Sequence, residues 1–130
     1  MAIIHLTKEL FEKRVALIGL HSTSFKFLGS RPALIDFYAD WCAPCQMLAP
    51  ILAELSEEFD GKVDFYKINV DEENELSSHF AIRSIPTLIF VPVNGAMQRS
   101  TGAITKSRLR EIIEKVLLEE IKRVGGFYEK

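Results

Sequence analysis

The feature that most constrains this chain is a pair of cysteines, Cys42 and Cys45, that are separated by two residues. They are the only cysteines of the sequence, and two thiols at this spacing can close a short disulfide. An apolar run precedes them and a helical pattern follows, so the pair is expected at a strand-to-helix junction. In the first turn of a helix, unpaired backbone N–H groups and the helix dipole favour a thiolate. Because the thiolate is the nucleophile, this position predicts a thiol–disulfide redox site in which Cys42 attacks and Cys45, one turn deeper, resolves the mixed disulfide.

Two other roles of the cysteine pair are disfavoured. A CxxC pair is half of a zinc site, but a closed structural site needs four ligands. The remaining candidates are His5, His21 and His79, which form no closely spaced histidine pair and lie far from the cysteines in sequence. We therefore expect no metal, and we expect the histidines at the surface or its boundary. Two inert core cysteines are also disfavoured, because a tryptophan precedes the pair and a proline lies within it.

Composition and charge narrow the class of protein. The chain has 130 residues, 48% of them hydrophobic and 26% charged, as expected for one globular domain with its own core. Its net charge of −2 gives no case for nucleic acid or an anionic membrane as partner. No apolar run is long enough to span a membrane, and the first residues lack a secretory pattern. These features predict the cytoplasm, or the periplasm if a leader has been removed.

Hydrophobic periodicity predicts alternating strands and helices. Strands are expected at 3–7, 33–39, 63–70, 82–91 and 97–101, the last two joined by a hairpin at Asn94–Gly95, and helices at 8–18, from the cysteines to 60–61, at 75–80, and from 106 to a stop at Gly125–Gly126. Pro50 is expected to kink its helix without ending it. The irregular segment between 20 and 31 is expected to pack Phe25, Phe27 and Leu28 onto the core.

Two charged residues stand out within the predicted strands. Asp36 lies in a strand that is otherwise apolar on both faces, and such a strand suits the centre of a covered sheet. An ionised carboxylate in a dry interior is costly and tends to be protonated or paired. Lys67 continues the apolar face that Val63 and Phe65 begin, although a lysine would not be chosen for packing.

The stretch 37–45, FYADWCAPC, together with 82–87, IRSIPT, resembles bacterial thioredoxins, and the likeness extends over nearly the whole chain. The resemblance implies the thioredoxin fold, an α/β architecture in which a central mixed five-stranded sheet is flanked by four helices. It also implies one domain over 1–130, with an N-terminal strand, helix and extended loop in 1–32 and the redox core in 33–130.

The resemblance assigns roles to residues. It makes Cys42 the exposed nucleophile, Cys45 the buried resolving thiol, and Asp36 the buried acid that moves a proton to and from Cys45. Lys67 is the neighbour of that acid, and Pro86 is a cis-proline that faces the disulfide. The implied substrate-facing surface consists of Trp41, Ala43, Pro44, Ile85, Pro86, Gly102 and Ala103.

The implied activity is reduction of protein disulfides through a Cys42–Cys45 dithiol/disulfide cycle, without a bound cofactor. The implied partners are disulfide-containing target proteins and a flavin-dependent thioredoxin reductase, and the chain is expected to be a monomer. Two alternatives remain open: an extracytoplasmic disulfide oxidase or isomerase, and a binding subunit whose redox activity is incidental.

The chain departs from the family pattern in four places. Ala43 replaces a glycine, Gln46 replaces a lysine, and Tyr38 stands where many members have tryptophan. Loss of the positive charge beside Cys45 removes one aid to thiolate formation, so a modest change of redox potential is expected. The segment Leu20–Pro32 is also longer than the compact family pattern and leaves room for a contact of its own.

Overall fold

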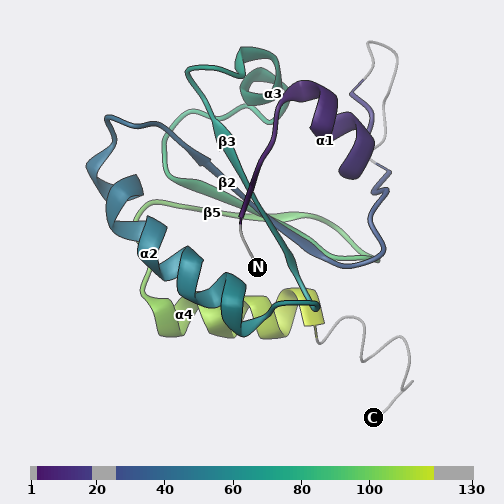
Figure 1. The fold of residues 1–130 in the computed structure, drawn as a ribbon, viewed down its shortest axis with the longest axis vertical. Coiled ribbons are helices and arrows are strands. Elements are labelled where there is room, and N and C mark those ends of the chain that lie inside the picture. Colours follow the sequence, from purple (N-terminus) through teal and green to yellow (C-terminus); the bar gives the residue numbers. More distant parts are fainter. Residues whose placement is uncertain (1–2, 19–25, 119–130) are drawn as a thin grey trace.

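The computed structural model describes residues 3–18 and 26–118, which form a mixed five-stranded sheet with helices on both faces (Figure 1). The strands are β1 (Ile4–His5), β2 (Ala33–Tyr38), β3 (Asp64–Asn69), β4 (Thr87–Val91) and β5 (Gln98–Thr101). They lie in the order β1-β3-β2-β4-β5. The pairs β1–β3 and β2–β3 are parallel, whereas β4 is antiparallel to both of its neighbours.

Within the described residues, four α-helices connect and cover the strands. They are α1 (Lys8–Arg14), α2 (Ala43–Glu58), α3 (Asn74–His79) and α4 (Lys106–Ile112), and α4 continues as a π-helical turn, η1 (Ile113–Leu118). Figure 1 shows α2 and α4 together on one side of the sheet and α1 and α3 on the other. No helix in the described ranges has both the length and the apolar character that crossing a membrane requires.

Local chemistry accounts for where the helices begin. Thr7 precedes α1 and its hydroxyl accepts the N–H of Leu10, and Thr105 caps α4 by accepting the N–H of Arg108, each over 3.2 Å. Such N-caps satisfy one of the free donors of a first turn. Pro50 lies inside α2, which continues through it, so the prediction that this proline does not end the helix is confirmed.

The core has two layers, one on each face of the sheet. On the α1/α3 side, Ile35 and Phe37 of β2 pack with residues of those helices such as Phe11 and Leu76. On the α2/α4 side, the buried set is Leu34, Leu48, Leu52, Leu55, Phe59, Val63, Phe65, Leu88, Phe90, Leu109, Ile113 and Leu117. Strand β2 is therefore buried on both faces, as predicted for a central strand, and its carboxyl end leads into the loop that carries Cys42.

Several element boundaries were predicted wrongly. α1 ends at Arg14 and not at Ile18. Val15 and Ile18 are nevertheless buried, but they belong to the irregular segment that follows the helix. β4 begins at Thr87 and not at residue 82, because Pro86 has no N–H for the ladder.

Leu28 was predicted to pack onto the core, but it is 49% exposed. Its backbone N–H donates to the Val15 carbonyl while its side chain points to solvent.

Other predictions on this part of the fold have mixed outcomes. Phe27 packs against the core as predicted. The predictions for Phe25 and for the stop of the last helix at Gly125–Gly126 fall outside the described residues. The π-helical turn that follows α4 had no signal in the sequence.

The burial of α2 gives a direct test of the fold. Leu55 is fully buried in the α2/α4 layer, whereas Leu17 is 66% exposed. We expect Leu55→Ala to lower the free energy of unfolding by about 2–5 kcal/mol, because it removes apolar contacts and leaves a cavity. Urea unfolding followed by circular dichroism measures this difference.

The matched control is Leu17→Ala, which should change the free energy of unfolding by less than about 0.5 kcal/mol. Equal losses in the two variants would contradict the placement of α2 on the sheet.

Candidate functional site

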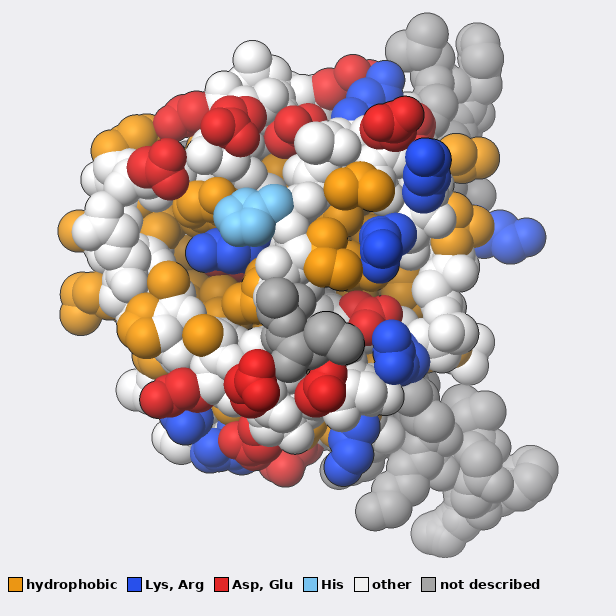
Figure 2. Space-filling model, viewed as in Figure 1, with side chains coloured by type: hydrophobic (Ala, Val, Ile, Leu, Met, Phe, Trp, Pro, Cys, Tyr) orange, Lys and Arg blue, Asp and Glu red, His pale blue; other side chains and the backbone are white. Residues whose placement is uncertain are grey.

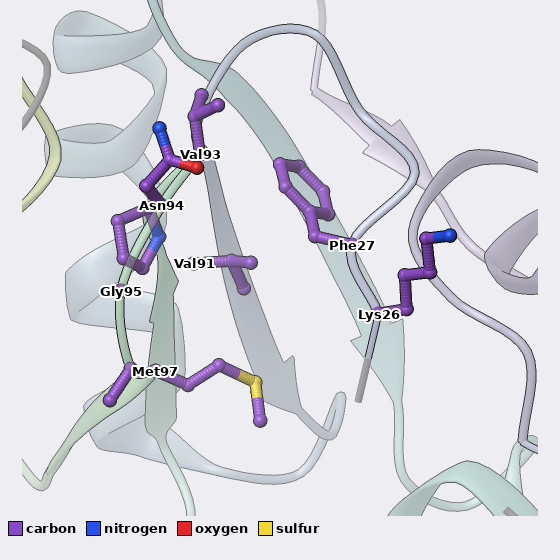
Figure 3. Close-up of a pocket in the computed structure, with 9 residues that line it drawn as sticks. Lys26, Phe27, Val91, Val93, Asn94, Gly95 and Met97 are labelled. Atoms are coloured by element: carbon purple, nitrogen blue, oxygen red, sulfur yellow. The ribbon is translucent and has the colours of Figure 1, made fainter. Parts of the chain in front are cut away.

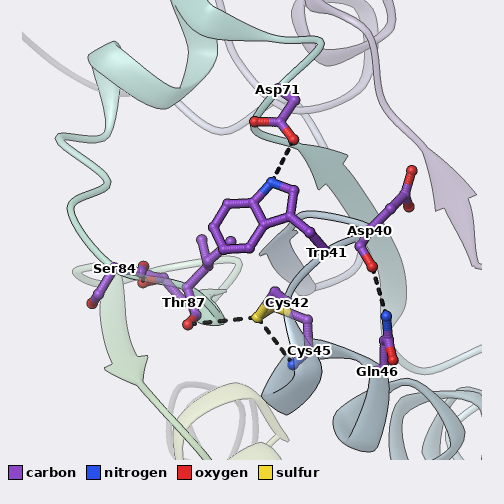
Figure 4. The surroundings of a disulfide bond; sticks show 9 residues. Asp40, Trp41, Cys42, Cys45, Gln46, Asp71, Ser84 and Thr87 are labelled. Carbon is purple, nitrogen blue, oxygen red and sulfur yellow. Dashed lines mark hydrogen bonds between the residues drawn. A yellow bond between two sulfur atoms is a disulfide. The ribbon is translucent and has the colours of Figure 1, made fainter.

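Cys42 and Cys45 form a disulfide where β2 passes into α2 (Figure 4). Cys42 is the N-cap of α2, one position before the helical turn in which it was predicted, and its Sγ accepts the backbone N–H of Cys45 over 3.2 Å. Pro44 lies in the first turn, where a missing N–H costs nothing. The first turn of α2 holds no acidic residue. The Cys42 sulfur therefore meets a backbone donor and the positive end of the helix dipole, both of which stabilise a thiolate.

Both sulfurs are enclosed in this oxidised form. Cys42 and Cys45 are each 4% exposed, whereas the resemblance implied an exposed Cys42 above a buried Cys45. The two cysteines form a buried cluster with Ala39, and Ile85, Tyr38 and Val70 pack against this cluster. The carbonyl oxygen of Ile85 lies 3.8 Å from the Sγ of Cys42.

The residues predicted to face a substrate surround this disulfide. Trp41 is 70% exposed, and Ala43 and Pro44 are also exposed beside it. The Ile85–Pro86 peptide bond is cis. The N–H of Gly102 donates to the Pro86 carbonyl over 2.9 Å, which places the turn containing Gly102 and Ala103 next to that loop. Gly102 has a φ of +88°, a conformation that glycine adopts without a steric penalty.

Contacts that the sequence analysis missed fix the rim of the site. The indole N–H of Trp41 donates to Asp71 over 2.8 Å, and the side-chain amide of Gln46 donates to the Asp40 carbonyl over 2.6 Å (Figure 4). Asp71 lies two residues after the end of β3, at the same sheet edge as the loop after the parallel strand β2, and this position is a signal that could have identified it. Met47, 75% exposed, adds an apolar side chain on α2 beside the cysteines.

Asp36 is buried in the middle of the sheet, at 1% exposure. Its neighbours in register are Lys67 on β3 and Leu88 on β4. Neither carboxylate oxygen has a hydrogen-bond partner among the described residues. Burial raises the pKa of Asp36 to about 7, and the positive charge of Lys67 opposes part of this rise. A carboxyl group with this pKa can take up and release a proton near neutral pH.

Lys67 lies opposite Asp36, as the resemblance implied, but its ammonium group lies on an aromatic ring. The Nζ atom is 4.5 Å from the centre of the Tyr38 ring. Lys67 therefore acts on Asp36 through its electric field, with the carboxylate left free of a direct partner.

The described residues hold no candidate metal site, and the hollow described below lies away from the disulfide. Within 3–18 and 26–118, no cluster of histidine, cysteine and acidic side chains could hold a metal ion. A hollow of about 370 Å³ is lined by Lys26, Phe27, Asn94, Met97 and their neighbours (Figure 3). It adjoins Val91, which pairs with the first residue of β2, Ala33, whereas the cysteines follow the last. The hollow is therefore at the opposite end of the sheet from the disulfide.

The surface around the site is partly acidic. Figure 2 shows hydrophobic side chains exposed between groups of aspartate and glutamate on the side of the molecule that Figure 1 presents. The loops beside the disulfide contribute three acidic residues, Asp40, Asp71 and Glu72, and all three are exposed.

Comparison with known proteins gives consistent matches. The family model described as thioredoxin matches residues 3–115. A thioredoxin of Borreliella burgdorferi is 40% identical over 111 residues, covering 85% of this chain and 94% of the relative. A thioredoxin of Buchnera aphidicola is 39% identical over 113 residues, covering 87% and 94%. The solved structure of chloroplastic thioredoxin z is similar with a TM-score of 0.74 and 28% identity, over 89% of this chain and 95% of that one.

The buried carboxyl group predicts a pH-dependent stability. Because the pKa of Asp36 is about 7 in the folded chain and 3.8 ordinarily, the folded state binds more protons between these values, and stability falls as pH rises through this window. Relative to Asp36→Asn, the oxidised wild-type chain should lose about 2–3 kcal/mol of unfolding free energy between about pH 5 and pH 8.

Urea unfolding of both chains at the two pH values gives the change in unfolding free energy with pH for each chain. Comparing the two changes removes any effect of the asparagine on packing, because that effect is the same at both pH values. Parallel stability profiles of the two chains would show that Asp36 titrates near its ordinary value.

Proposed function

Because this chain belongs to the thioredoxin family of thiol–disulfide oxidoreductases, which reduce protein disulfides, we propose that its Cys42–Cys45 dithiol passes two electrons to disulfides in target proteins. The observation that carries the assignment of roles is the N–H of Cys45 donating to the Cys42 sulfur at the start of α2. A thiolate at Cys42 would accept the same hydrogen bond more strongly, because the acceptor is then charged. Cys42 is accordingly the attacking sulfur.

The proposed reaction has two exchange steps. The Cys42 thiolate attacks one sulfur of a target disulfide, a mixed disulfide forms, and the other target sulfur leaves as a thiolate that takes up a proton. Cys45 then loses its proton and attacks the Cys42 sulfur, which breaks the mixed disulfide and releases the second target thiol. The chain ends with a Cys42–Cys45 disulfide, and the target has gained two electrons and two protons.

Asp36 is proposed to accept the proton of Cys45 in the second step. A pKa of about 7 places this carboxyl group closer to the ordinary pKa of a thiol than an exposed aspartate would be, which makes it a better base for that proton. Its location supports the role, since Asp36 lies on β2, on the face that α2 covers, and α2 begins at the cysteines. Lys67 limits the rise of the pKa, so the carboxyl group can still ionise.

The target segment is proposed to bind across the apolar surface around the disulfide. Trp41 offers a large exposed ring, and the backbone of Ile85 faces the Cys42 sulfur. An extended peptide can pair with such a backbone without demanding particular side chains. The proposed surface is Trp41, Ala43, Pro44, Ile85, Pro86, Gly102 and Ala103.

The setting of the cycle is proposed from the family. The chain works as one domain and as a monomer, through its own disulfide and without a bound cofactor, in a reducing compartment such as the cytoplasm. A flavin-dependent thioredoxin reductase returns the disulfide to the dithiol. The comparisons do not favour an extracytoplasmic oxidase or a binding subunit.

The attacking sulfur is tested by insulin reduction. Cys42→Ser should reduce insulin no faster than dithiothreitol alone, since a hydroxyl is a poor nucleophile at neutral pH. Turbidity of the precipitating insulin chain measures the rate. Leu17→Ala, on the exposed surface after α1, serves as the control and should keep the wild-type rate. A Cys42→Ser chain with the wild-type rate would overturn the proposal.

The resolving sulfur is tested by trapping. Cys45→Ser should accumulate mixed disulfides with target proteins through Cys42, because the second exchange step is blocked. Non-reducing electrophoresis shows these as bands that disappear with reductant. Cys42→Ser should trap nothing. Complexes that persist when both cysteines are replaced would instead support a binding subunit.

A further inference from the structure

Four side chains form a continuous set beside the disulfide, across three strands. His5 on β1 is in register with Lys67 on β3, and Lys67 is in register with Asp36 on β2. Residues paired in register, and residues two apart on one strand, point to the same face of a sheet. Tyr38 is two residues beyond Asp36, so all four lie on the side that α2 and α4 cover.

The contacts within this set are specific. The ammonium group of Lys67 lies 4.5 Å from the centre of the Tyr38 ring. The Tyr38 hydroxyl and Nδ1 of His5 share a hydrogen bond of 3.3 Å, and the two rings meet edge to face with centroids 6.0 Å apart. Asp36 receives no hydrogen bond from the described residues. The ring of Tyr38, and not the carboxylate, therefore holds the lysine.

We propose that Tyr38, fixed in place by His5, seats the ammonium group of Lys67 and is thereby a positioning residue for Asp36. This inference rests on the proposed function, in which Asp36 takes the proton of Cys45. It assigns a part in the reaction to the edge strand β1, which β3 separates from the strand that leads to the cysteines.

The physical case starts from the freedom of a lysine side chain. A four-carbon chain can place its charge at many distances from Asp36, and the field at the carboxylate depends on that distance. An aromatic face attracts a cation and gives the ammonium group one preferred position. Seated there, Lys67 attracts the carboxylate without binding it, which leaves Asp36 able to exchange protons.

The charged groups around Tyr38 indicate where Lys67 would move if the ring did not hold its ammonium group. Tyr38 is faced by His5 from β1, Lys67 and Asn69 from β3, Asp36 from its own strand, and the carboxylates of Asp40 and Glu72. Burial and those carboxylates raise the pKa of the Tyr38 hydroxyl, so the ring stays neutral.

Asp40 and Glu72 belong to the loops that follow β2 and β3, beyond Tyr38 as seen from Asp36. A lysine released from the ring would be drawn toward them and toward water, away from Asp36.

The direct test is the pKa of Asp36, measured by NMR of its carboxyl carbon in the oxidised full-length chain. Tyr38→Leu should raise this pKa by about half a pH unit or more, because the attraction from Lys67 weakens. In a Lys67→Met background the same substitution should change it little. An Asp36 pKa that is unchanged or lowered in Tyr38→Leu would overturn the proposal, as would an equal rise in both backgrounds.

Two milder variants keep the test decisive if Tyr38→Leu fails to fold. Tyr38→Phe keeps the ring and His5→Ala keeps the tyrosine, and each removes the same hydroxyl–imidazole bond. Each should raise the Asp36 pKa by a smaller amount, and the double variant should raise it no further than either one. Additive effects, or none in either variant, would show that His5 does not hold the ring.

A rate measurement separates this inference from the proposed function. In the active variants, the pH at which disulfide reduction reaches half of its maximal rate should rise together with the Asp36 pKa. A wild-type chain without reductase activity would overturn the proposed function. If the wild-type chain is active but substitutions at Tyr38 leave the pKa of Asp36 unchanged, only the proposed positioning role of Tyr38 is overturned.

Discussion

The hydrogen bond from the N–H of Cys45 to the Cys42 sulfur is the contact on which the chemistry of this fold depends. It exists because α2 begins one residue after Cys42, and the direction of α2 is set by Leu52 and Leu55, which are buried against the sheet. The apolar core thus decides where a backbone donor points. A donor fixed in this way needs no rearrangement when the sulfur becomes charged, so it stabilises the thiolate more than the thiol.

The same core has the opposite effect on Asp36, because it disfavours the charged form of this carboxyl group. The packing that holds α2 removes water from Asp36, and loss of hydration disfavours the ionised carboxylate. A lysine in direct contact would restore the charge and lower the pKa, and the acid would then be a weak base. With Lys67 on the ring of Tyr38, the pKa lies between these limits, at about 7. Ionisation of the buried Asp36 therefore lowers the free energy of unfolding at neutral pH, and the same raised pKa makes Asp36 a proton acceptor.

The fold and the chemical centre were largely predictable because their signals are local or periodic. The spacing of Cys42 and Cys45, the apolar stripe of α2, and a charged residue in a buried strand each indicate one structure. What could not be predicted depends on contacts between distant segments. The end of α1, the contact of Trp41 with Asp71, and the bond between His5 and Tyr38 join residues whose proximity only the folded sheet creates.

Gln46 shows how a departure from the family pattern can leave the geometry of the site in place. Its side-chain amide holds the carbonyl of Asp40 and so ties the loop before Cys42 to the first turn of α2. A glutamine can make this tie but brings no positive charge, so the thiolate depends on the backbone donor and the helix dipole, which do not vary with side-chain identity. The reaction therefore depends on backbone geometry, whereas any change of redox potential is expected to come from the side chains at the rim, Ala43 and Gln46 among them.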